Sequence, residues 1–76
     1  MDITYMYKNK SLKYDEFIIS KKCYLFLNGI FILCNIDKYY TDKYIISGMY
    51  LDTYIEIKIN SETSYNNFKI NKYDGH

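Results

Sequence analysis

Hydrophobic and polar side chains alternate along much of the chain with a period of two, and sustained helical spacing is scarce. Successive residues of a strand point to opposite faces, so this alternation predicts a β-dominated protein. We expect an all-β fold of about five to seven short strands, with room for one short helix over residues 12–21. The architectures that fit are a small antiparallel sheet, a sandwich, or an SH3- or OB-like barrel.

The clearest pattern is a β-hairpin over residues 22–36. Two apolar runs flank Asn28-Gly29, a pair that favours the two-residue type I′ turn. Such a turn fixes the register, and it places Leu27 opposite Ile30 and Cys23 opposite Cys34. One face of the hairpin is then entirely apolar, and we assign it to the core. Its members are Cys23, Leu25, Leu27, Ile30, Ile32 and Cys34.

The second face of this hairpin is apolar as well. It carries Tyr24, Phe26, Phe31 and Leu33, where a half-exposed hairpin would carry polar residues. Two explanations stay open. Another layer of strands or a short helix covers this face, or the face meets a partner protein or a second copy of the chain.

Residues 43–59 contain further strands. Ser47-Gly48 is interpreted as a tight turn or a bulge within this block. Residues 53–59 alternate regularly, so Ile55, Ile57 and Ile59 are expected to point inward and their neighbours to water. A short edge strand is expected near residues 68–73, after the polar stretch that begins at Asn60.

Three other segments are less regular. Residues 3–7 are expected to form a strand. Residues 12–19 fit a helix that begins after a cap at Ser11, or a strand over residues 17–19, and we favour the strand. Residues 37–42 are expected to form a loop or a single helical turn between the two blocks.

Composition narrows the class of protein. The chain has 76 residues, 49% of them hydrophobic and 20% aromatic, with a formal net charge of +1. This length predicts one small domain over residues 1–76, without a deep enzymatic cleft. The abundance of Ile, Lys, Asn and Tyr and the lack of Arg and Pro indicate an AT-rich genome, which explains most of the 11 tyrosines. No signal peptide and no membrane-spanning run is apparent, so we expect a cytoplasmic protein, in the host cytoplasm if it is viral.

The sequence offers little catalytic chemistry. Its only histidine is the terminal residue, His76, where no fold can hold it in position. Cys23 and Cys34 are expected to be buried free thiols, with a disulfide as the alternative, because a cytosolic chain keeps thiols reduced. We therefore expect no enzyme, no cofactor and no metal site.

A binding role remains. We expect a small inhibitor of the anti-CRISPR kind, encoded by a phage or mobile element, that occupies the working surface of a host defence or regulatory protein. Candidate contacts are the second hairpin face together with the exposed tyrosines Tyr39, Tyr40 and Tyr54. Acidic groups at Asp37, Asp42 and Asp52 would imitate phosphates. The alternatives are a small β-barrel that binds a nucleotide signal or single-stranded nucleic acid through Tyr stacking and Lys, and a self-associating structural protein.

Overall fold

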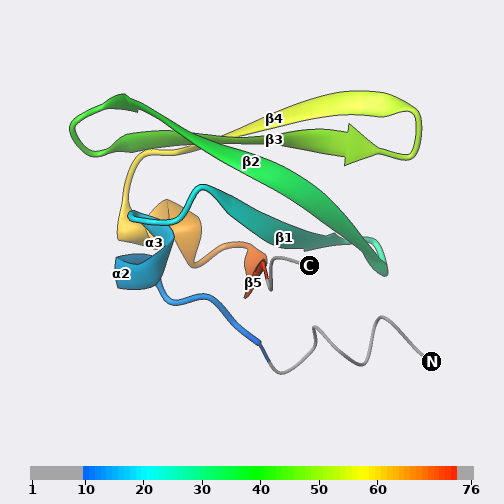
Figure 1. Cartoon of the computed structure of the whole chain (residues 1–76), viewed down its shortest axis with the longest axis horizontal. Helices are drawn as coiled ribbons and strands as arrows, with labels where there is room; N and C mark the ends of the chain where they lie inside the picture. Colours follow the sequence, from blue (N-terminus) through cyan, green and yellow to red (C-terminus); the bar gives the residue numbers. More distant parts are fainter. Residues whose placement is uncertain (1–9, 74–76) are drawn as a thin grey trace.

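The structure is a computed structural model that describes residues 10–73. It contains one open antiparallel sheet of five strands in the order β4-β3-β2-β1-β5, and two single-turn helices (Figure 1). The elements are α2 (Tyr14–Phe17), β1 (Lys22–Leu27), β2 (Ile30–Tyr40), β3 (Lys43–Tyr50), β4 (Thr53–Ile59), α3 (Glu62–Tyr65) and β5 (Lys69–Lys72). The all-β prediction is confirmed, and of the expected architectures the open sheet is the one observed. The strand expected at residues 3–7 lies outside the described residues.

The hairpin β1–β2 has the predicted register. Cys23 pairs with Cys34 and Leu27 with Ile30, with every intermediate pair as expected. Asn28 and Gly29 have φ angles of 49° and 81°, the left-handed backbone that a type I′ turn requires at both central positions. The dipeptide therefore determined the pairing of the two strands, as the sequence indicated.

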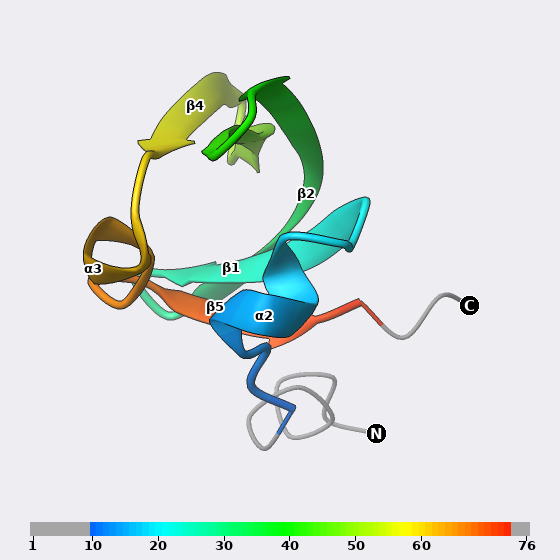
Figure 2. The ribbon, with the colours of Figure 1, turned by 90° about the vertical axis from the view of Figure 1, so that its left-hand side faces the viewer.

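The sheet is strongly curled, and the core lies on its concave side. Figure 2 shows the strands arranged as an arc, and Figure 1 shows α2 and α3 together at one end of the molecule. Phe17 of α2 is fully buried, and its ring packs 4.7 Å from that of Tyr65 in α3 and 5.5 Å from that of Tyr44 in β3. The helices therefore close one end of the curled sheet with aromatic side chains. The other core residues are Leu12, Cys23, Leu25, Ile32, Cys34, Ile36, Ile46, Ile59 and Ile70.

The prediction of a strand over residues 17–19 is wrong, because α2 ends at Phe17 and residues 18–19 form a turn. The helix begins at Tyr14 and follows Lys13, so Ser11 is not its cap. The amides of Phe17 and Ile18 donate to carbonyls four residues earlier, at 2.8 and 3.1 Å. A helix of one turn is unstable alone, and burial of Phe17 is what holds it.

The prediction of a loop or a single helical turn at residues 37–42 is also wrong for most of these residues. Strand β2 continues to Tyr40, with an irregularity in its register between Lys38 and Tyr40, and only residues 41–42 form the turn to β3. Residues 37–40 lack the alternation of apolar and polar side chains that predicts a strand. They are extended because they pair with β3.

Ser47-Gly48 is neither a turn nor a bulge but part of the continuous strand β3. A Cβ atom at Gly48 would stand 2.8 Å from the carbonyl oxygen of Leu33 in the neighbouring strand. The glycine is therefore required by close approach of two strands in the curled sheet rather than by a change of chain direction.

The two edges of the sheet differ. Beside β5, Leu12 N donates to Ile70 O at 2.9 Å and Lys72 N donates to Lys10 O at 2.7 Å, so residues 10–12 flank that edge. At the opposite edge, no strand among residues 10–73 pairs with the outer side of β4. The sheet thus has one flanked edge and one open edge within the described chain.

Candidate functional site

The second face of the β1–β2 hairpin lies on the outer, convex side of the sheet. Leu33 is 46% exposed, whereas Tyr24, Phe26 and Phe31 are half-buried. The rings of Phe26 and Phe31 pack against each other with their centroids 4.8 Å apart. The partial burial of this face therefore comes in part from its own side chains.

Two residues from the neighbouring strands extend this face. Met49 of β3 and Tyr54 of β4 are directly paired in the register and are 53% and 60% exposed. Both line a shallow hollow together with Leu33 and Phe31. We define the outer apolar face as Tyr24, Phe26, Phe31, Leu33, Met49 and Tyr54.

Polar side chains surround the centre of the outer apolar face. Asn35 and Ser47 line the same hollow, and the hydroxyl of Tyr54 donates to Glu56 Oε2 at 3.0 Å. An apolar centre with a polar rim is the usual anatomy of a protein-binding surface. The sequence did not predict Met49 as a contact residue. The turn expected at Ser47-Gly48 would interrupt the strand, whereas Ile45, Ser47 and Met49 in fact alternate along one side of β3.

Basic and aromatic side chains meet on the β1–β5 side of this face. Lys22 Nζ lies 5.5 Å from the ring centroid of Tyr73, and Lys69 Nζ lies 5.7 Å from that of Phe26. The rings of Tyr24 and Tyr73 are 5.7 Å apart. These distances are within the range of cation–π and tilted ring contacts.

The remaining expected contact residues lie elsewhere. Tyr39 and Tyr40 stand at the end of β2 with ring centroids 5.2 Å apart, and Asp42 in the following turn lies 3.9 Å from Lys43 Nζ. Asp52 occupies the turn at the other end of β3.

Asp37 is exposed within β2, between these two ends of the sheet. An eight-residue strand spans roughly 25 Å, so the three expected phosphate mimics do not form one acidic surface. Of the ten candidate residues, the structure brings together Tyr24, Phe26, Phe31, Leu33 and Tyr54 on one face.

The two cysteines are free and buried, as expected from the sequence. Cys34 donates its thiol to the carbonyl of Ile32 at 3.6 Å. Burial raises the pKa of Cys23 to about 12 and that of Cys34 to about 11. At neutral pH both are thiols rather than thiolates, so neither is a nucleophile. Among residues 10–73, His, Cys, Asp and Glu form no group of three that is placed to hold a metal ion.

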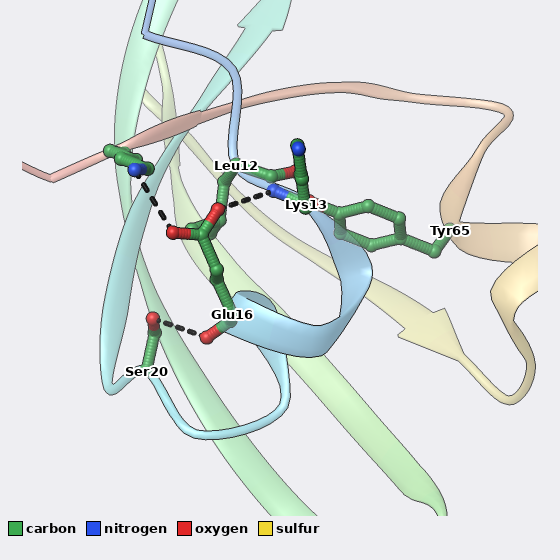
Figure 3. A network of polar contacts seen from close by, with 6 residues as sticks. Leu12, Lys13, Glu16, Ser20 and Tyr65 are labelled. Carbon is green, nitrogen blue, oxygen red and sulfur yellow. Dashed lines mark hydrogen bonds and ion pairs between the residues drawn. The ribbon is translucent and has the colours of Figure 1, made fainter.

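A second hollow lies beside α2, and Glu16, Ser20 and Lys72 in its lining form polar contacts with one another (Figure 3). Glu16 accepts hydrogen bonds from Lys72 Nζ at 2.9 Å and from Lys13 N at 3.2 Å. The hydrogen bond from Lys72 is the main cause of the lowered pKa of Glu16. Nearby, the buried hydroxyl of Tyr65 donates to the carbonyl of Leu12. The contacts of Glu16 and Tyr65 thus attach α2, α3 and residues 10–12 to the sheet.

Comparison with protein-family models, with curated proteins and with solved structures finds no match for this chain. Within the described residues, no helix has the length and apolar character that crossing a membrane requires. The function is therefore inferred from the surfaces of the molecule.

Proposed function

We propose that the protein is a non-enzymatic binding protein that recognises a partner protein through the outer apolar face. The observation that carries this proposal is the placement of Leu33, Met49 and Tyr54 together on the solvent side of three adjacent strands, each about half exposed or more. A contiguous apolar patch with a polar rim stabilises a complex when a partner removes it from water.

The expected partner surface follows from this anatomy. The hollow between Leu33, Met49 and Tyr54 accepts an apolar side chain of the partner. Asn35 and Glu56 at the rim supply one amide and one carboxylate for hydrogen bonds. The partner is therefore a protein with an apolar protrusion bordered by donor groups.

A capture experiment with matched variants tests the proposal. The immobilised chain should retain one stoichiometric protein from a bacterial lysate, and Leu33→Lys should weaken retention about tenfold or more, because burying the exposed part of Leu33 contributes about 1 kcal/mol and a buried lysine costs further. Ile19→Lys is the control, since Ile19 is 82% exposed but lies beside α2 and does not line the hollow of Leu33, Met49 and Tyr54. Equal capture by Leu33→Lys and wild type, or capture of nothing, would refute the proposal.

In its narrower form the proposal is an inhibitor encoded by a phage or mobile element. Its support is the small size of the chain and the lack of a recognisable catalytic motif in the sequence. The captured protein should then be a host defence or regulatory protein whose activity falls when the chain binds in equimolar amount. A captured protein that keeps full activity in the complex would contradict the inhibitor role while leaving the binding role in place.

A second candidate is binding of single-stranded nucleic acid or a nucleotide. The observation that favours it is the basic and aromatic margin at Lys22, Phe26, Lys69 and Tyr73, because bases stack on aromatic rings while lysines contact phosphates. Titration with an oligothymidylate should then quench tyrosine fluorescence, with affinity that falls steeply with salt.

The basic margin can be removed by the double substitution Lys22→Glu with Lys69→Glu, which should abolish the quenching. The matched control is Lys38→Glu with Lys43→Glu, which changes the net charge equally, since Lys38 is exposed in β2 and Lys43 Nζ lies 5.8 Å from the ring of Tyr40 at a different end of the sheet. Quenching that is absent, or equally lost in the control, would contradict a nucleic-acid site at this margin.

A further inference from the structure

The outer edge of β4 is a seven-residue strand edge that pairs with no other segment among residues 10–73. In Figure 1 this strand runs along the upper border of the sheet, with β3 on its other side. An unpaired edge presents a row of backbone N–H and C=O groups, which favours addition of another strand. Of the usual protections against such pairing, β4 lacks a proline and an inward-pointing charge, and its charged side chains are the exposed Glu56 and Lys58.

The side chains of β4 determine which strand fits this edge. Ile55, Ile57 and Ile59 point to the concave side, and Glu56 and Lys58 are exposed on the convex side. Neither Glu56 nor Lys58 forms an ion pair with another residue of the described chain. The edge therefore carries one negative and one positive charge, two residues apart, on either side of Ile57.

This arrangement is self-complementary. When two copies of β4 lie antiparallel about a two-fold axis at Ile57, each Glu56 stands opposite the Lys58 of the other copy. The same register places Ile57 opposite Ile57 and Ile55 opposite Ile59, so the apolar side chains also meet on one face. A shift of the axis to Glu56 or to Lys58 would place like charges directly opposite each other.

We infer that β4 is a dimerisation edge, and that its occupant is β4 of a second copy of this chain in the register centred on Ile57. The pairing extends the sheet from five strands to ten across the two copies. It uses backbone groups at the sheet edge and does not depend on the proposed function, although Tyr54 and Glu56 of β4 also belong to the outer apolar face and its rim.

Sedimentation equilibrium with charge-reversal variants tests this inference. The wild type should dimerise with a dissociation constant below about 1 mM. Glu56→Lys and Lys58→Glu should each weaken the dimer about tenfold or more, because each creates two pairs of like charges. The combined variant Glu56→Lys with Lys58→Glu exchanges the two charges, restores both opposite pairs, and should return the dissociation constant to within about threefold of wild type.

The control for net charge is Asp37→Lys, which changes the charge by the same amount as Glu56→Lys at an exposed position of β2. It should leave the dimer unchanged, and amide hydrogen exchange should slow in residues 53–59 as the protein concentration rises. A monomer at all concentrations, failure of the double reversal to restore dimerisation, or slowed exchange at residues 24–33 instead would overturn the inference.

Discussion

At Gly48, the close approach of β3 to β2 leaves no room for a Cβ atom. A Cβ atom there would lie 2.8 Å from the Leu33 carbonyl oxygen, 3.0 Å from Cys34 Sγ and 3.1 Å from Ile32 Cγ2. The first of these neighbours is backbone within the paired strand β2, so it cannot rotate away. Gly48→Ala should therefore force β2 and β3 apart and destabilise the protein by about 1–3 kcal/mol, the usual cost of overpacking.

Thermal and urea unfolding followed by circular dichroism measures this loss. A destabilisation of that size lowers the melting temperature of a domain this small by about 4 °C or more. Ser47→Ala is the matched control, because Ser47 neighbours Gly48 on the other face of β3 and its side-chain hydroxyl forms no hydrogen bond with the described residues. Its unfolding free energy should change by less than about 0.5 kcal/mol.

A double-mutant cycle identifies which neighbour of Gly48 causes the destabilisation of Gly48→Ala. If the Leu33 carbonyl is the obstacle, adding Cys34→Ala should not recover the stability lost in Gly48→Ala, and the coupling energy should stay below about 0.5 kcal/mol. Recovery in the double variant would instead identify the sulfur as the obstacle. A Gly48→Ala variant as stable as wild type would refute the close approach of the two strands.

Three further predictions concern the core and α2. Burial raises the pKa of Cys23 to about 12 and that of Cys34 to about 11, so an aromatic disulfide reagent at pH 8 should label both thiols slowly in the folded protein and rapidly in denaturant. A reductant should not shift the melting temperature. Rapid labelling of the folded protein would contradict this prediction. Tyr65→Phe leaves the buried carbonyl of Leu12 without its donor and should cost about 1–3 kcal/mol in urea unfolding, whereas an unchanged midpoint would show that the bond contributes nothing. The pKa of Glu16 is lowered in the folded state, so its contribution to stability is complete at neutral pH and should be lost as the pH falls below about 4.3. Glu16→Gln should make the free energy of unfolding depend less on pH in this acid range. Identical pH profiles for the variant and the wild type would be inconsistent with the ion pair between Glu16 and Lys72.

The parts of the fold that follow from the sequence are those specified locally. The turn at Asn28-Gly29 determines the pairing of β1 with β2 residue by residue, and the alternation of residues 53–59 identifies the buried side of β4. In each case a short pattern and one backbone preference are sufficient, because strand faces alternate strictly.

The elements that the sequence did not predict depend on contacts between distant residues. Helix α2 is stable because Phe17 packs on Tyr65. Helix α3 was not predicted because the residues that cap it, Ser61 and Ser64, lie in a polar stretch without apolar periodicity. In the sequence, Gly48 indicates a turn, and only the position of β2 beside it shows that the glycine is needed for close strand packing. Such tertiary contacts override local propensity and cannot be derived from the pattern alone.

The candidate site was predicted only in part for the same reason. Pairing within one hairpin places Tyr24, Phe26, Phe31 and Leu33 on one face, and the sequence is sufficient for that step. The addition of Met49 depends on the register of β3 against β2 and β4, which no short motif encodes.

The flank that residues 10–12 provide along β5 bears on the dimer that we infer for β4. A molecule with an open strand edge on both sides of its sheet can add further molecules indefinitely, which is the route to a fibril. Within the described residues this molecule has an open edge on one side only, so a symmetric pairing through β4 consumes the edges of both copies. The dimer that we infer should therefore stop at two copies, because neither copy keeps an open β4 edge for a further strand.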